Sequence, residues 1–323
     1  TKSGKRVNKW QQRIRKPVTP FVPKAAPGLR SAVPGVKLHK EVMRIILPIL
    51  LIISSLPASA IVVRHDVTDK KYNADATDFA PLATLYVDGA HGSLIKPDWI
   101  VTAAHATFCI SPGSYLRLNN GYHKVESVFV HKDYQPSKSH DIALIKLVNP
   151  INDVKPANLY EQTNELAKIT WFIGVGGTGN GLTGQIVDNY ENGGVLRKAQ
   201  NQIEQAEGPL LKFKFDRDDV ALPLEGVSGS GDSGGPAYST IDGTHYLLGI
   251  SSRVEGGDIG EYGVMEVYSR VSFFTSWIEK ITAGEEALQQ QLAFPKLQRL
   301  PAGLTEQILP QVCAVISLKP NAV

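Results

Sequence analysis

The sequence predicts an all-β fold, a sandwich or a barrel, over most of its length. From Ile61 to about Tyr268, short apolar runs alternate with positions rich in Gly, Asn, Asp and Pro. The runs carry many β-branched and aromatic residues, with clear examples at residues 83–87, 99–102, 125–130 and 142–147. Runs of about four to eight residues bounded by turn residues are typical of strands in such folds.

One helical pattern follows these strands. Apolar side chains recur at helical spacing at Val271, Phe274, Trp277, Ile278 and Ile281. We therefore expect a helix at the end of the β-rich region. The sequence assigns no role to residues 283–323, which follow this helix.

The first 42 residues differ from the rest in charge. Residues 1–42 are rich in Lys and Arg and hold one acidic residue, Glu41, so the net charge of +3 is unevenly placed along the chain. We interpret this Pro-rich segment as a disordered basic leader, either an over-extended start or a non-native addition. Nucleic acid or an anionic membrane would suit such a charge. No nucleic-acid motif accompanies it, and we expect no nucleic-acid partner.

Residues 43–60 have the layout of a secretory signal peptide. A basic start at Arg44 leads into an apolar run, and the segment ends in Ala58-Ser59-Ala60. A buried core segment is the alternative, whereas a membrane span needs about 20 apolar residues. We expect a secreted or periplasmic protein that begins at Ile61 and has no membrane span once the signal is removed.

The chain contains two cysteines, Cys109 and Cys313, which lie 204 residues apart. Two cysteines cannot form a dense disulfide framework. They could form a single bridge or remain two buried thiols, and the sequence leaves both alternatives open.

Three short motifs bring together residue types suited to nucleophilic catalysis. They are VTAAH ending at His105, HDIAL containing Asp141, and GDSGGP containing Ser233. Each alone is compatible with an ordinary loop or core residue. A serine hydroxyl needs an adjacent base, histidine has a suitable pKa, and a carboxylate can orient the imidazole. In this order the three predict a catalytic triad.

The chain resembles the chymotrypsin–trypsin family over residues 61–282. Besides the three motifs, the resemblance rests on GSLI at residues 92–95, WIVT at 99–102 and SWI at 276–278. It implies two six-stranded antiparallel β-barrels followed by a C-terminal helix. It also implies a secreted, monomeric serine endopeptidase without cofactor or metal, which hydrolyses protein or peptide substrates through an acyl-enzyme. Gly231 and Ser233 would supply the N–H groups of the oxyanion hole.

The resemblance also implies an activation mechanism. Signal removal after Ala60 would expose Ile61, whose new amino group would pair with Asp232. A departure from the family pattern is that Val63 and Arg64 stand where two glycines are usual.

Other departures concern disulfides and specificity. Ala106 and Ala90 replace one cysteine pair of the family, and Gly229 stands at a cysteine position beside the serine motif. Ser252, Arg253 and Val254 align with the strand that binds substrate backbone.

Two further positions align with the specificity pocket. Val227 stands at the pocket floor where trypsin is acidic, and Glu266 stands at a wall position that is usually Gly. Glu266 could receive a Lys or Arg side chain, or fill the pocket together with Val254. We favour the second. Arg253 could pair with Glu266 or favour acidic substrates.

Two other functions compete with proteolysis. A family member could act as a binding or regulatory protein with little proteolysis. The spacing Gly231-x-Ser233-x-Gly235 also fits the nucleophile elbow of α/β-hydrolases. That fold places the acid and the histidine after the serine, and here His245 is the one histidine after Ser233. We therefore disfavour an esterase.

Overall fold

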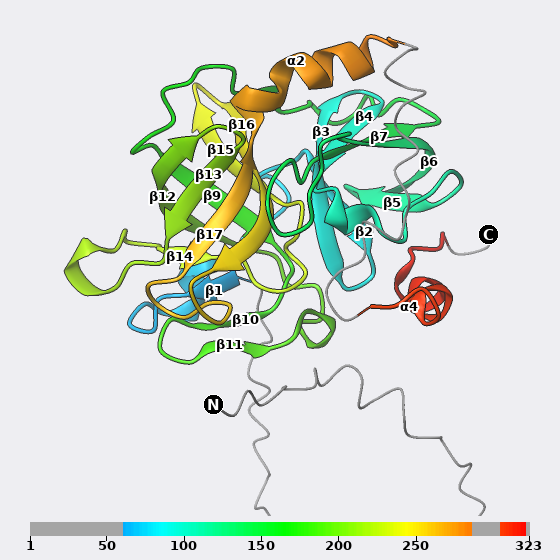
Figure 1. Cartoon of the computed structure of the whole chain (residues 1–323). Coiled ribbons are helices and arrows are strands. Elements are labelled where there is room, and N and C mark those ends of the chain that lie inside the picture. The colour runs from blue at the N-terminus through cyan, green and yellow to red at the C-terminus, as the bar shows by residue number, and fades with distance from the viewer. Residues whose placement is uncertain (1–60, 286–303, 321–323) are drawn as a thin grey trace, which may run out of the picture. The chain divides into compact units, whose positions relative to one another are not determined.

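The computed structural model describes residues 61–285 and 304–320. The predicted leader, residues 1–42, and the predicted signal peptide, residues 43–60, lie outside the described residues. Within the described part the chain forms two closed, six-stranded antiparallel β-barrels followed by a helix (Figure 1), which confirms the predicted fold.

The first barrel follows the strand order β2-β3-β4-β7-β6-β5 and closes through the pairing of β2 with β5. Large aliphatic side chains, including Leu94, Ile100 and Ile145, fill its interior. Its strands are β2 (Leu82–Tyr86), β3 (Gly89–Lys96), β4 (Trp99–Thr102), β5 (Tyr115–Leu118), β6 (Gly121–Val130) and β7 (Ala143–Leu147).

The second barrel follows the order β15-β9-β12-β13-β17-β16 and closes through β15 and β16. Its core contains the rings of Phe172, Phe213 and Tyr268, whose centroids lie 4.9–5.0 Å apart. Its strands are β9 (Ile169–Gly174), β12 (Arg197–Glu207), β13 (Leu210–Lys214), β15 (Pro236–Ile241), β16 (Thr244–Glu255) and β17 (Met265–Arg270). The short strand β8 (Asn158–Leu159) adds parallel to β16.

A separate small sheet holds the start of the described chain. Strand β1 (Ile61–Val63) is fully buried between β10 (Thr178–Asn180) and β14 (Gly226–Val227), and β11 (Gly184–Val187) pairs with β10. In the part of the chain that the structure describes, four short 3₁₀ helices lie in connections: η2 (Asp69–Tyr72), η3 (His105–Thr107), η4 (Asn189–Glu191) and η5 (Asp218–Val220).

The predicted helix is α2 (Val271–Thr282), which runs across the top of Figure 1. It buries Val271, Phe274, Ile278 and Ile281 in the same apolar cluster as the first-barrel core. Trp277 of the predicted stripe is partly buried against that cluster. The helix that follows the second barrel therefore packs against the core of the first barrel.

A second helix, α4 (Leu309–Ile316), lies in the segment to which the sequence assigns no role. A disulfide joins Cys109 to Cys313, which decides between the two alternatives left open by the sequence. Within residues 61–285 and 304–320, no helix has the length and apolar character needed to cross a membrane.

Candidate active site

The pairing of β4 with β7 brings His105 and Asp141 together. Thr102 at the end of β4 lies opposite Ala143 at the start of β7. Because the strands are antiparallel, the residues just after Thr102 and just before Ala143 lie beside each other. His105 Nδ1 lies 2.7 Å from Asp141 Oδ2, and the His105 backbone N–H donates to Asp141 Oδ1 at 2.9 Å.

Asp141 is buried and receives a further hydrogen bond. The Ser252 hydroxyl donates to Asp141 Oδ2 at 2.6 Å. Burial alone would raise the pKa of Asp141, but the charge of His105 and the hydrogen bonds from His105 and Ser252 hold this pKa below its usual value. The residue therefore stays an anion. Ser252 was predicted only to contact substrate backbone, so its hydroxyl has a second contact that sequence reasoning missed.

The pKa of the His105 imidazole is shifted in the opposite direction from that of Asp141. Burial would lower its pKa, but the charge of Asp141 and their hydrogen bond outweigh burial and raise the pKa of His105 above its usual value of 6.5. With Nδ1 facing the carboxylate, the other ring nitrogen is left to act as a base. This is the arrangement required of a general base that activates a hydroxyl.

Ser233 lies in the loop between β14 and β15 and lines the same cavity as His105. The loop is fixed to the first barrel, because His91 N–H donates to the Ser233 carbonyl at 2.8 Å. The next residue, Gly234, has a φ of +76°, and a Cβ there would lie 2.2 Å from Thr102 Oγ1. Only glycine allows this close approach of the nucleophile loop to β4.

The backbone at Gly231 and Ser233 leaves two donors free. Gly231 has a φ of +90°, and its carbonyl accepts a hydrogen bond from Ala90 N–H at 2.6 Å. In the described part of the chain, the N–H groups of Gly231 and Ser233 donate to no protein acceptor. Free N–H groups next to a nucleophile can bind a developing oxyanion.

Asp232 is buried behind this loop. Its carboxylate accepts hydrogen bonds from Gly176 N–H at 2.7 Å and Gly229 N–H at 2.9 Å. His91 Nε2 lies 3.7 Å away and accepts a hydrogen bond from Val175 N–H. Sequence reasoning missed His91, because a lone histidine in an apolar strand carries no motif.

Ile61 is fully buried. It lies in β1, which pairs with β14, the strand that leads into the loop of Asp232 and Ser233. Among the described residues no ion pair joins Ile61 to Asp232, since Ile61 is here an internal residue with a peptide nitrogen.

The cavity at His105 and Ser233 has a volume of about 330 Å³. Ser252, Arg253, Val254 and Glu266, which the sequence predicts to bind substrate, line it. Val227 does not line it. Its side chain is fully buried in an apolar cluster with Val62, Phe215 and Val264, because strand β14 pairs with β1.

Glu266 contributes a carboxyl group to the cavity wall. It is 1% exposed, and its Oε1 has no hydrogen-bond partner. Burial, together with the negative charge of Asp232, raises the pKa of Glu266 well above its usual value, although Ser228 hydrogen bonds oppose this. Burial therefore favours the neutral form of the Glu266 carboxyl.

Arg253 does not pair with Glu266, which corrects one of the two roles considered for it. Its guanidinium binds Glu255, with Nη2 and Nε at 2.6 and 3.1 Å from Oε1. Glu255 also binds Lys212 at 2.9 Å. Arg253 and Glu255 lie two positions apart on β16, so their side chains share one face of the strand.

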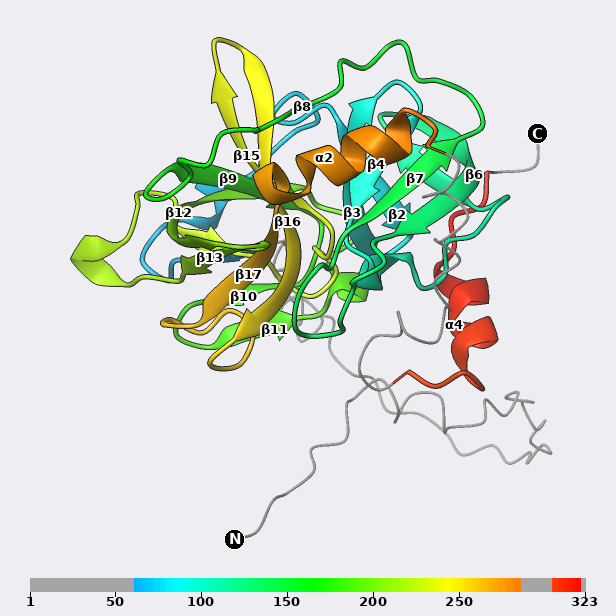
Figure 2. The same cartoon turned by 45° about the horizontal axis from the view of Figure 1, so that its top comes forward.

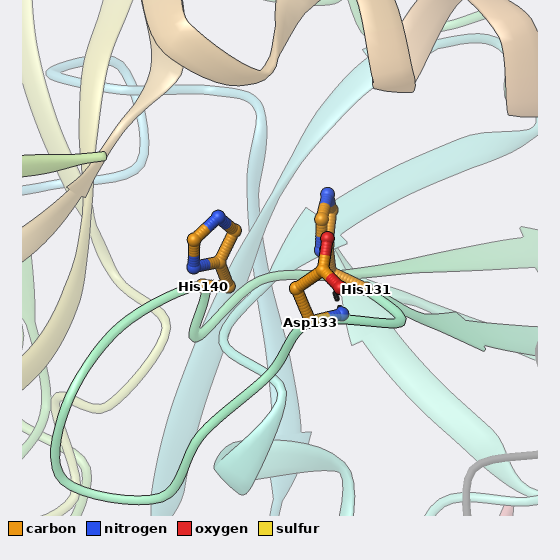
Figure 3. Close-up of side chains that lie close together, drawn as sticks. All are labelled: His131, Asp133 and His140. Carbon is orange, nitrogen blue, oxygen red and sulfur yellow. Dashed lines mark hydrogen bonds and ion pairs between the residues drawn. The ribbon is translucent and has the colours of Figure 1, made fainter. Parts of the chain in front are cut away.

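One group of three potential metal ligands occurs among the described residues, although the sequence spacing predicted no metal site. His131, Asp133 and His140 each offer a ligand atom within 4.8 Å of the others (Figure 3). Two imidazoles and a carboxylate could hold a divalent ion such as zinc.

The same three residues belong to the loop between β6 and β7, which also contains Asp141. His131 Nδ1 accepts a hydrogen bond from Asp133 N–H, and the His131 ring lies 4.9 Å from that of Trp277. Burial, with the neighbouring His140, lowers the pKa of His131 to about 4. The His140 ring lies 5.5 Å from that of Phe274, and burial lowers the pKa of His140 as well, so both ends of the loop pack against α2.

Comparisons with known proteins agree with this geometry. A family model described as Trypsin matches residues 70–278, more than half of the 323 residues. Tryptase from Mus musculus is 28% identical over 228 residues, which cover 60% of this chain and 79% of the tryptase. Serine protease SSP1 from Scolopendra subspinipes is 30% identical over 237 residues, covering 62% and 77%. Coagulation factor IX from Cavia porcellus is 30% identical over 210 residues, covering 58% and 70%.

Proposed function

Because the chain belongs to the trypsin family of serine proteases, we propose that it is a secreted endopeptidase that hydrolyses peptide bonds through an acyl-enzyme at Ser233. The observation that supports this most is the orientation of His105 by Asp141 in the cavity that Ser233 also lines. The peptidase domain would comprise residues 61–282, with residues 43–60 as its signal peptide.

The proposed reaction has two balanced halves. His105 Nε2 takes the proton of the Ser233 hydroxyl while Oγ attacks the substrate carbonyl, and the N–H groups of Gly231 and Ser233 stabilise the oxyanion. His105 then gives this proton to the leaving amine, and the peptide bond breaks. A water molecule repeats the sequence on the acyl-enzyme and releases the acid. Asp141 stays ionised and stabilises the imidazolium.

The competing function is a binding or regulatory protein. A sulfonyl fluoride distinguishes the two, because it modifies a serine only where a base activates it. We expect mass spectrometry of protein beginning at Ile61 to locate the label at Ser233. Ser230→Ala is the matched control, since Ser230 lines the same cavity, and it should label normally. Absence of both label and peptide hydrolysis in such protein would favour the binding function.

The pH dependence of activity should follow the protonation of His105. The base must be neutral, and its pKa is raised above 6.5, so kcat/KM should rise with pH through a midpoint above 6.5. In Asp141→Asn the anion that raises this pKa is absent while burial remains. The acid limb of the residual activity should therefore move to lower pH, as measured with a fluorogenic peptide. An unmoved limb would show that another group controls it.

Glu266 should determine which side chain enters the pocket. The open cavity and the unpartnered Oε1 favour uptake of a Lys or Arg side chain over a pocket filled by Glu266 and Val254. A cationic side chain would ionise the carboxyl and supply the absent hydrogen bond. A hydrogen bond to a charged group contributes about 1.5–3 kcal/mol, so Glu266→Gln should lower kcat/KM for Lys and Arg substrates about 10- to 100-fold.

A peptide library cleaved by wild type, Glu266→Gln and Glu261→Gln tests this expectation. Glu261 is exposed, so its replacement removes the same charge outside the cavity and should leave the preference unchanged. If Glu266→Gln keeps the wild-type preference, Glu266 does not select the side chain.

A further inference from the structure

The C-terminal segment is attached to the first barrel beside the active site. Cys313 of α4 is bonded to Cys109, which follows His105 by four residues. Beyond α4 the backbone continues the barrel edge, with bridges from Tyr86 to Ser317 and from Tyr115 to Leu318. The α4 segment lies near β2 and β5 in Figure 1, and it stays on the side of the first barrel in the turned view of Figure 2. These contacts join residues far apart in the sequence into one structural unit.

One face of this segment is buried. Val312, Ile316 and Leu318 are 5–7% exposed, and the first two belong to the apolar cluster of the first barrel. Val315, one position before Ile316, is 75% exposed. The Ile316 carbonyl accepts a hydrogen bond from Val87 N–H at 2.9 Å, which fixes the end of α4 at the turn after β2. The position of Ile316 is therefore set by both packing and backbone hydrogen bonding.

Ile316 also lines the active-site cavity. Around it, the first-barrel side of the cavity wall includes Tyr86, Ala106 and Phe108, all apolar apart from the tyrosine hydroxyl. That hydroxyl is directed away from solvent, because it donates to the Ala106 carbonyl at 2.6 Å. Asp88 and Asn189, two of the polar residues of the cavity, line it as well.

The two sides of the cavity differ in their relation to the substrate. Glu266 and strand β16 line the second-barrel side, and the side chain that Glu266 would select belongs to the acyl portion of the substrate, before the scissile bond. The residues after the scissile bond then leave Ser233 over the first-barrel side. We propose that Ile316, with Tyr86 and Phe108, forms a subsite that binds an apolar side chain of the leaving-group portion of the substrate. This proposal rests on the proposed protease function.

The disulfide makes this subsite conditional. Ile316 is three residues from Cys313 on the same helix, and the disulfide links that helix covalently to the barrel. Replacement of both cysteines by serine removes the link without leaving a reactive thiol. The double variant Cys109→Ser/Cys313→Ser should lose apolar preference in the same direction as a change at Ile316.

Acyl transfer measures this subsite separately from acylation. The acyl-enzyme is formed from an N-blocked lysine ester, which has no amino-acid residue after the reacting bond. It is then partitioned between water and either leucinamide or glycinamide. The ratio of the two transfer products depends on how each amide binds, and not on how fast the acyl-enzyme forms.

We expect wild type to favour leucinamide, and Ile316→Ser to reduce that preference about tenfold, the size typical of altered apolar contacts. Ile316→Trp, which keeps apolar packing but occupies the subsite, should reverse the preference toward glycinamide. Val315→Ser, on the exposed face of the same helix, should behave as wild type.

The outcomes separate the two proposals. If wild type forms acyl-enzyme and both Ile316 variants keep its product ratio, the subsite proposal is wrong while the protease function stands. If no form beginning at Ile61 hydrolyses any ester or peptide, the protease function itself is wrong.

Discussion

Replacement of Asp141 by asparagine is expected to lower kcat for peptide hydrolysis about 10⁴-fold, the loss seen for this change in a protease with the same triad. An amide NH₂ placed at Oδ2 would face His105 Nδ1, which now donates to that oxygen at 2.7 Å. The imidazole would have to turn its lone pair toward Asp141 and its proton toward Ser233. In that tautomer it cannot take the serine proton.

The fold should tolerate this change. Asparagine has the shape of aspartate, and its remaining oxygen can still accept the His105 backbone N–H. The Ser252 hydroxyl can rotate to accept from the new NH₂ group instead of donating to Oδ2. Kinetics of the folded variant, with circular dichroism as a check, should show lowered kcat and little change in KM. Asp133→Asn, an exposed neighbour of the same loop, is the matched control. A kcat within tenfold of wild type would contradict the assigned role of Asp141.

The apolar runs predicted the strands, and the resemblance to the chymotrypsin–trypsin family implied the two barrels and the position of His105 beside Asp141. Each of these residues adjoins a strand with a clear apolar run, and strand pairing of β4 with β7 then dictates their contact. Ser233 is held by glycines whose conformations leave no alternative residue type. The need for glycine depends on the local backbone conformation, so the residue type itself indicates it.

Features that depend on long-range packing were not accessible in the same way. The bond between Cys109 and Cys313 spans 204 residues and carries no spacing signature. The entry of Ile316 into the cavity follows from that bond, so it was equally invisible. Val227 was expected at the pocket floor, but the sequence could not show that its side chain packs against Val62 instead.

Arg253 shows a competition that a sequence does not rank. Two carboxylates were within its reach in principle, and the structure gives Glu255 the contact because both side chains lie on one face of β16. Glu266 is left with an unpartnered oxygen. This buried, unsatisfied group is what shifts the interpretation from a filled pocket to one that receives a donor.

Release of Ile61 from the preceding chain should also have a large effect, because it couples cleavage to the shape of the serine loop. With a residue attached before it, Ile61 has a φ of 65°, a conformation strained for a β-branched side chain. Cleavage removes the peptide unit that defines this angle and so relieves the strain. It also creates an ammonium group at the start of β1, which pairs with β14, the strand that leads into the loop of Asp232.

Two forms of the protein test this coupling, one beginning at Ile61 and one retaining Ala60. A buried ion pair that loses one partner costs about 3–5 kcal/mol, so the extended form should be about 10²- to 10³-fold less active in kcat/KM. In Asp232→Asn the carboxylate is absent, and the extension should then make little difference. If Ala60 lowers activity equally in wild type and Asp232→Asn, the extension acts by some route other than Asp232.

N-terminal sequencing of secreted, active protein supplies the second measurement, and a start other than Ile61 would contradict activation by signal removal. The oxyanion donors of Gly231 and Ser233 flank Asp232 directly, so an ion pair formed there stabilises the backbone conformation on which the proposed chemistry depends.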